Sequence, residues 1–149
     1  MASTIQNSDL IVTLDEKLVL SGKNQGNNLT YTLGSINEVS KRILTVPNDS
    51  EIIAATFGAS VAGGTYKTDS VRYIRVVNLD DTNWVRLRLF VDAASDKIAD
   101  MLIQPRQIFI LGSPKLSDTA VFGSFSNLTS LKLQANTAAV DVELMIASA

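Results

Sequence analysis

Residues 71–91 read VRYIRVVNLDDTNWVRLRLFV, two β-branched and aromatic runs on either side of a short polar cluster. Runs of this composition around a cluster of Asn, Asp and Thr predict a β-hairpin. Side chains in the second run alternate strictly, which is the period of a strand with one apolar face. The apolar face is predicted to carry Val85, Leu87, Leu89 and Val91, and the opposite face Trp84, Arg86, Arg88 and Phe90.

Short runs of the same kind recur along the whole chain, separated by turn-forming residues at intervals of about ten positions. They occupy residues 9–14, 17–20, 29–33, 41–46, 51–57, 97–103, 108–112, 128–135 and 139–147. Residues 36–46 could instead contain a helical turn, but Pro47 favours a strand because it disfavours helical geometry at Val46. Residues 97–103 could be helix or strand, and we favour strand. The glycine-containing residues 58–68 are predicted to form a flexible loop or a weak edge strand.

The fold class follows from this spacing. We predict an all-β protein, an antiparallel two-sheet sandwich of jelly-roll-like type with little or no helix. The 149 residues are the size of one ordinary domain. We assign residues 1–9 to a polar N-terminal arm, held by a neighbouring subunit or by the domain's own edge. Residues 10–149 are assigned to a single β-sandwich domain.

Composition excludes several classes of function. The net charge of −2 and the isoelectric point near 5.0 argue against nucleic-acid binding, which needs a basic surface. Histidine and cysteine are both absent, which removes the commonest general acid–base, the commonest metal ligands and any disulfide. The first eight residues do not resemble a signal peptide, and no apolar run is long enough to cross a membrane. A mean hydropathy of +0.17 points weakly to apolar surface buried against a partner.

We therefore predict that the protein is not an enzyme and has no catalytic, cofactor-binding or metal-binding residues. The acidic clusters lie in predicted turns, where Asp bonds to nearby backbone, although a Ca²⁺ site or a glycosidase pair is the alternative. These clusters are Asp15 with Glu16, Asp80 with Asp81, and Asp92 with Asp96. The glycine-rich residues 22–26 and 58–64 match no phosphate-binding fingerprint.

The candidate binding site is the polar face of the central run. Arg86 and Arg88 are predicted to share this face with Trp84 and Phe90, and Trp with Arg is the combination that dominates protein interfaces. The alternatives are a solvated outer face, whose long side chains cover apolar surface, or a site for sugar or phosphate. We predict Trp84, Arg86, Arg88 and Phe90 as partner-binding residues.

Three segments carry a resemblance to a known family: WVRLRL at 84–89, IQPRQIFI at 103–110, and LKLQANTAAVDVE at 131–143. They resemble small β-sandwich structural proteins of tailed-bacteriophage virions, over about residues 70–147. In that family an alternating arginine strand precedes a proline-centred turn with an aromatic residue, and the chain ends in a strand of the Ala-x-Thr-x-x-Val-Asp-Val-Glu type. The pair Pro105-Arg106 stands here where those proteins usually have Pro-Gly.

The resemblance implies a non-enzymatic capsid cement or decoration protein that binds across coat-subunit joints and stabilises the shell, or else a head–tail or tail component. It implies a homo-oligomer, trimer or dimer, whose partners are the major capsid protein or other virion proteins. The protein would be made in the host cytoplasm and reside in the virion, with no nucleic-acid, membrane or cofactor partner. Two alternatives remain: an enzyme that uses Lys or Asp alone, and a lectin-like carbohydrate-binding module. The aromatic candidates for sugar stacking are Trp84, Tyr66, Tyr73 and Tyr31.

Overall fold

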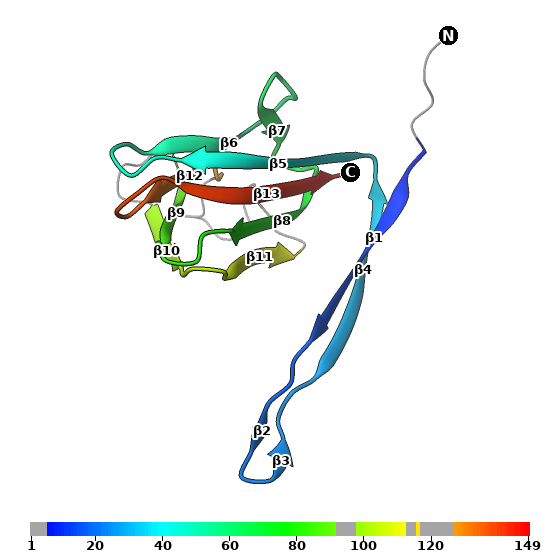
Figure 1. The fold of residues 1–149 in the computed structure, drawn as a ribbon. Coiled ribbons are helices and arrows are strands. Elements are labelled where there is room, and N and C mark those ends of the chain that lie inside the picture. The colour runs from blue at the N-terminus through cyan, green and yellow to red at the C-terminus, as the bar shows by residue number, and fades with distance from the viewer. Residues whose placement is uncertain (1–5, 92–97, 113–115, 117–126) are drawn as a thin grey trace.

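The structure is a computed structural model that describes residues 6–91, 98–112, 116 and 127–149 (Figure 1). Every regular element within these residues is a β-strand, which confirms the predicted all-β class. Residues 1–5 of the predicted N-terminal arm, the predicted turn at 92–96 and most of the predicted loop at 113–123 lie outside the described residues. The strands are β1 (Ser8–Asp15), β2 (Val19–Leu20), β3 (Lys23–Asn24), β4 (Asn28–Ile36), β5 (Glu38–Val46), β6 (Ile52–Gly58), β7 (Thr65–Lys67), β8 (Val71–Asn78), β9 (Val85–Phe90), β10 (Ile98–Ile103), β11 (Ile108–Gly112), β12 (Ser130–Ala135) and β13 (Val140–Ser148).

Two sheets form the body of the protein as a β-sandwich. One has four strands in the order β11-β8-β13-β5, and the other has five in the order β10-β9-β12-β6-β7. The short strand β7 pairs with β6 in parallel, so residues 58–68 contain the weak edge strand that was one of the two predictions for them. When β7 is set aside, consecutive strands from β5 to β13 lie in opposite sheets except for the neighbours β9 and β10, which is the double Greek-key order of a jelly roll.

Strict alternation of side chains places the core between the sheets. On β13, Val140, Val142, Leu144 and Ile146 are at most 1% exposed, as their spacing predicts. They pack against inward residues of the opposite sheet, and the resulting core needs no disulfide or metal. The fully buried side chains of the body include Val46, Val71, Ile74, Val76, Val85, Leu87, Leu131 and Leu133.

The prediction that residues 71–91 form a hairpin is wrong. Strand β8 pairs with β11 and β13 in the four-stranded sheet, whereas β9 pairs with β10 and β12 in the five-stranded sheet. The polar residues between them therefore carry the chain from one layer to the other. Asp80 shapes this crossing, since its carboxylate accepts the backbone N–H groups of Thr82 and Asn83. The connection of β10 to β11 is likewise a crossing between the sheets.

Asn78 joins these two crossings. Its side chain is buried, and its Nδ2 donates to the carbonyls of Asn83 at 2.8 Å, Ile103 at 3.1 Å and Gln104 at 3.2 Å. Its Oδ1 accepts the backbone N–H of Asp80 at 3.0 Å. Backbone groups that leave a sheet need such partners when they are buried. One carboxamide thus bonds to the backbone of two of the connections by which the chain changes layers at this end of the sandwich.

The first strands form a hairpin outside both layers, which we call the hairpin arm (residues 8–36). Strands β1 and β4 pair from Ser8 opposite Ile36 to Asp15 opposite Asn28, and the short strands β2 and β3 continue toward the tip. At the tip Ser21 and Gly22 have φ values of 51° and 77°, the signature of a two-residue type I′ turn. Figure 1 shows the arm leaving the sandwich beside β5 and projecting past it. The strands predicted within residues 9–33 are thus present, but they belong to this arm.

Replacement of the buried Asn78 tests its role in joining the crossings. Asn78→Ala leaves three carbonyls of buried or partly buried backbone without their donor, so we expect a loss of about 3 kcal/mol in the free energy of unfolding. Urea denaturation followed by tryptophan fluorescence measures this loss. Asn28→Ala, at an exposed position of the arm, is the matched control. A loss as small as that of the control would contradict the role given to Asn78.

The turn after β10 offers a stabilising substitution. Pro105-Arg106 occupies its centre, the N–H of Gln107 donates to the carbonyl of Gln104 at 3.0 Å, and Arg106 has a φ of 58°. This is type II geometry, in which glycine is preferred at the second central position. Left-handed backbone costs a side chain about 1 kcal/mol, and the exposed pair of Arg106 with Asp81 at 3.6 Å adds little.

We therefore expect Arg106→Gly to raise the free energy of unfolding by about 0.5 kcal/mol, after allowance for the greater freedom of glycine in the unfolded chain. Arg106→Ala is the control, because it removes the same ion pair while keeping a Cβ atom. Thermal unfolding of the two variants side by side measures the difference. Equal stability of the glycine and alanine variants would be incompatible with strain at this position.

Candidate functional site

The predicted partner-binding residues lie on the outer surface of the five-stranded sheet. Arg86, Arg88 and Phe90 point outward from β9, while Val85 and Leu87 are fully buried, so the predicted faces are correct. Trp84 immediately precedes the strand and is half-buried. The two arginine side chains are only 28% and 23% exposed. The assignment of these four residues to a partner remains a prediction.

Both arginines bond to carboxylates of neighbouring strands. Glu51, at the start of β6, lies 2.8 Å from Arg86, 3.3 Å from Arg88 and 3.6 Å from Lys132 on β12. Asp100 on β10 accepts two hydrogen bonds from Arg88, at 2.7 and 2.8 Å. Three cations and two anions thus form one network across four strands. Such networks hold long side chains in fixed positions, although each exposed pair stabilises the fold little.

The aromatic ring of Phe90 extends this network. The Nζ atom of Lys132 lies 3.9 Å from the centre of the ring, in cation–π contact. Gln134 accepts a hydrogen bond of 2.7 Å from Arg86. Alternation along β12 turns Lys132 and Gln134 outward, and the pairing of β12 with β9 places them opposite Arg88 and Arg86, which no local pattern in the sequence predicted. The face therefore offers a partner an ordered mixture of ring edge, guanidinium and amide groups.

The network shifts the pKa of two of its members. The hydrogen bonds from Arg88 lower the pKa of the Asp100 carboxyl, and its partial burial opposes them weakly. The same bonds raise the pKa of Arg88, with a further contribution from the charge of Glu51. Both groups are therefore held in their charged forms near neutral pH.

A small pocket lies beside Trp84. It has a volume of about 240 Å³ and is lined by polar side chains of Asn48, Arg86, Gln134 and Asn136 together with the indole. Ligand pockets usually measure roughly 300–1,000 Å³, so this one is small for a sugar. Two of the other aromatic residues considered for sugar stacking, Tyr66 and Tyr73, are buried and cannot stack on a ligand.

The acidic clusters have structural roles where the structure describes them. Asp80 caps the crossing between β8 and β9, and hydrogen bonds from the backbone of Asn83 and Thr82 lower its pKa. Asp15 pairs with Lys17 at 3.4 Å in the arm. Asp92 and Asp96 lie outside the described residues. Among those described, no three His, Cys, Asp or Glu side chains gather as a metal site, and no helix could cross a bilayer.

The hairpin arm carries a second candidate surface that the sequence did not suggest. Its cross-strand pairs place an apolar ladder on one face of the hairpin. The exposure of this ladder rises along the arm, from 8% at Leu33 near the body to 50% at Leu29. The pairs are Leu10 opposite Leu33, Val12 opposite Tyr31, and Leu14 opposite Leu29.

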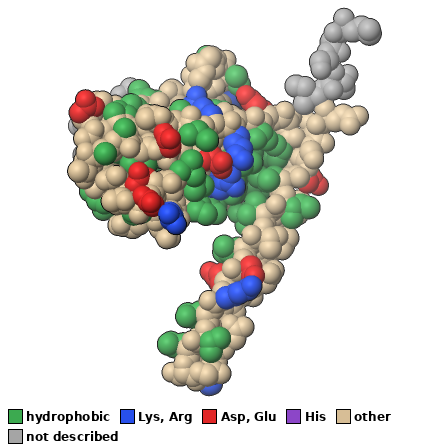
Figure 2. All heavy atoms as spheres, viewed as in Figure 1, with side chains coloured by type: hydrophobic (Ala, Val, Ile, Leu, Met, Phe, Trp, Pro, Cys, Tyr) green, Lys and Arg blue, Asp and Glu red, His purple; other side chains and the backbone are tan. Residues whose placement is uncertain are grey.

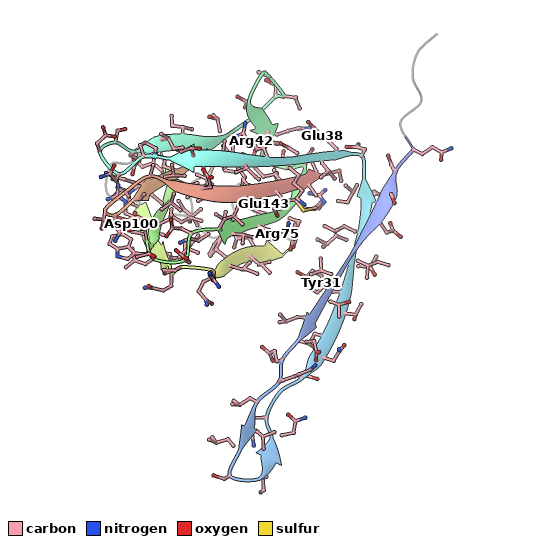
Figure 3. The ribbon with its side chains drawn as sticks, viewed as in Figure 1. Tyr31, Glu38, Arg42, Arg75, Asp100 and Glu143 are labelled. Atoms are coloured by element: carbon pink, nitrogen blue, oxygen red, sulfur yellow. The ribbon has the colours of Figure 1, made fainter. Side chains whose placement is uncertain are left out.

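The base of the arm packs on the outer surface of the four-stranded sheet. Leu33 and Ile36 form a separate apolar cluster with Tyr73 and Ala147, which lie side by side on β8 and β13. Further along, Tyr31 reaches the edge strand β11 at Gly112, where a groove of about 520 Å³ opens between the arm and Ile110. Figure 3 shows Tyr31 on the arm beside the body. The arm thus crosses one end of this sheet.

The apolar ladder becomes exposed at the outer end of this groove, which Leu14 lines. Leu14 and Leu29 are exposed, and Leu18, Val19 and Leu20 near the tip are exposed as well. From Leu14 to the tip turn the chain advances about 25 Å, at roughly 3.3 Å per residue. A row of exposed aliphatic side chains on a projecting hairpin is a feature of surfaces that bind another protein.

No protein-family model, curated protein or solved structure matches this chain.

The lowered pKa of Asp100 predicts a dependence of stability on pH. A carboxyl whose pKa is lower in the folded than in the unfolded chain stabilises the fold above its ordinary pKa. That stabilisation is lost as the pH falls through the folded value. Asp100→Asn removes this stabilisation at every pH. Between about pH 7 and pH 3 we therefore expect the free energy of unfolding to fall by about 0.5 kcal/mol less in the variant than in the native chain.

Urea denaturation at the two pH values measures the difference. Asp49→Asn, in the exposed turn before β6, is the control for removal of one negative charge from the surface. Identical acid dependence of the native chain and of the Asp100 variant would show that the bond from Arg88 does not stabilise the folded state.

Proposed function

We propose that this protein is a non-enzymatic structural subunit of a virion, of the capsid cement or decoration type. The observation that carries the proposal is the hairpin arm, which projects from a compact sandwich with the far end of its apolar ladder, at Leu14 and Leu29, uncovered. A monomer gains nothing from holding such a ladder in water. A subunit that must contact a neighbour gains a pre-ordered binding element, because the paired strands lose little further entropy on binding.

Two other observations support the virion setting. The jelly-roll arrangement of the body is common in viral capsid domains, although lectins share it and a fold by itself does not assign a function. The segments at 84–89, 103–110 and 131–143 resemble those of phage β-sandwich structural proteins. The first of these segments lies on β9, and the third runs from β12, which pairs with β9, into β13 of the opposite sheet.

The proposal assigns different tasks to the two candidate surfaces. The ordered face with Trp84, Arg86, Arg88 and Phe90 contacts the coat, and the hairpin arm contacts a neighbouring subunit. Weak contacts of this kind become strong when many copies bind a symmetric shell together. The partner is the major capsid protein or another virion protein, and the protein joins the virion after synthesis in the host cytoplasm.

Binding to shells tests the proposal directly. The purified protein is sedimented with empty shells assembled from the coat protein of the same virus, and the bound amount is measured by quantitative gel densitometry. We expect saturation at a fixed number of copies per shell and a higher melting temperature of the decorated shell. Absence of saturable binding to the shell and to purified tails would end the proposal. Saturable binding to tails alone would identify the protein as a tail component instead.

The predicted coat-binding face has its own test. Arg86→Gln with Arg88→Gln removes both guanidinium groups while keeping amides that can bond to Glu51 and Asp100. We expect the affinity for shells to fall at least about tenfold, which is a loss of ~1.4 kcal/mol or more in binding free energy. Lys67→Gln, at an exposed position on β7, is the control for lost positive charge. Unchanged affinity in the double variant would place the coat contact elsewhere.

A further inference from the structure

The outer surface of the four-stranded sheet is only partly covered by the chain's own arm. The pairing of its strands arranges the outward side chains in three successive rows. The base of the arm packs on the first row, through Tyr73 and Ala147. The rows are Gly112, Tyr73, Ala147 and Val39; then Ile110, Arg75, Met145 and Lys41; then Ile108, Val77, Glu143 and Ile43.

The second and third rows form an apolar surface around a central ion pair. Ile43 at one edge is 63% exposed, and Ile108 at the other is 57% exposed. Between them Glu143 bonds to Arg75 and lies 3.4 Å from Lys41. Figure 2 shows hydrophobic side chains gathered around these charges on the face that meets the arm. Figure 3 shows Arg75 and Glu143 close together on the same sheet. We call rows two and three the open face.

This chain therefore has two exposed apolar surfaces, the distal arm (residues 14–29) and the open face. Within one molecule they meet only at the groove that Leu14 and Ile110 line, and Ile43 and Ile108 stay exposed. The arm crosses the first row, approaches the second at the groove beside Ile110, and then continues past β11, away from the third row (Figure 1). We infer that the distal arm of one molecule docks on the open face of a second copy of this chain. The inference rests on the proposed assembly role and adds the identity of the partner that the arm binds.

The arm's own base shows that the two surfaces are compatible. The proximal end of the same ladder already packs on the first row of the same sheet, where Leu33 and Tyr73 are buried. The distal end repeats this chemistry with Leu14 and Leu29. The docking in a second copy thus continues an apolar contact that the chain makes within itself.

The length of the arm also fits a second copy. Four strands spaced by about 4.8 Å place the two edge strands of a sheet about 14 Å apart. The distal arm, at about 25 Å, is long enough to cross that width, as the base of the arm crosses the first row.

An arm-to-face contact joins unlike surfaces. Used reciprocally it gives an isologous two-fold dimer, in which each arm lies on the other subunit, and used in one direction it gives a heterologous ring such as a trimer. In both cases every molecule uses one arm and one open face. This symmetry makes the contact testable by mixing variants.

The experiment measures self-association of the full chain by sedimentation-velocity centrifugation over a range of concentrations. The arm variant is Leu14→Ser with Leu29→Ser, and the face variant is Ile43→Ser with Ile108→Ser. We expect the native chain to self-associate and each variant to dissociate at least tenfold more readily. The controls are Ile11→Ser, on the opposite face of the arm, and Ile53→Ser, on the five-stranded sheet; both residues are as exposed as the tested ones. Circular dichroism and urea denaturation confirm that the variants are folded.

Mixing supplies the decisive readout. The arm variant keeps an intact open face and the face variant keeps an intact arm, so an equimolar mixture is expected to form heterodimers that neither variant forms alone. A native chain that stays monomeric at its highest soluble concentration overturns the inference, and so does a face variant that associates like the native chain. A monomeric chain that still saturates shells overturns this inference and leaves the proposed function standing. Self-association of the kind described, without binding to shells or tails, supports this inference and overturns the proposed function.

Discussion

The two layers of this protein are held in relation to each other by the buried carboxamide of Asn78. It lies where β8 leaves the four-stranded sheet, and it bonds to the backbone of two connections that carry the chain across the sandwich, from β8 to β9 and from β10 to β11. Because these connections are fixed together, β9 and β10 must lie behind β8 and β11. The outer surface bearing the arginines and the outer surface crossed by the arm are consequently on opposite sides of the molecule.

Alternation of side chains was sufficient to predict which residues face the core, but it could not predict which strands pair. The inward residues Val85 and Leu87 of β9 were predicted correctly because any sandwich must bury the apolar side of a two-residue period. The hairpin predicted for residues 71–91 failed for a specific reason. A polar cluster that contains Asn78 and Asp80 serves equally well to reverse the chain within one sheet or to lead it into the opposite sheet. Remote strands, β11 and β13, decide between the two by occupying both sides of β8.

The candidate surfaces were predictable to different extents. Trp84, Arg86, Arg88 and Phe90 were predicted to share a face, and the structure places them on one. Their carboxylate partners Glu51 and Asp100 come from strands that no local pattern links to β9. The arm escaped prediction because residues 10–33 alternate as sandwich strands do. The alternation in a strand predicts that one of its faces is buried. It does not predict whether that face is buried by the opposite sheet, by another part of the same molecule or by a different molecule.

The order of strand pairing has a consequence for how the protein folds. The arm pairs residues that are close in sequence, and hairpins of this kind form within about 1–10 µs. The sandwich must bring Val140 beside Val46, and β-proteins with such distant pairings fold in roughly milliseconds to seconds. The arm is also the first part of the chain described here to be synthesised. We therefore expect the hairpin arm of a nascent molecule to form before the four-stranded sheet. Exposed arms would then be present before any open face to which they could bind. A high concentration of nascent chains would consequently favour aggregation over ordered assembly.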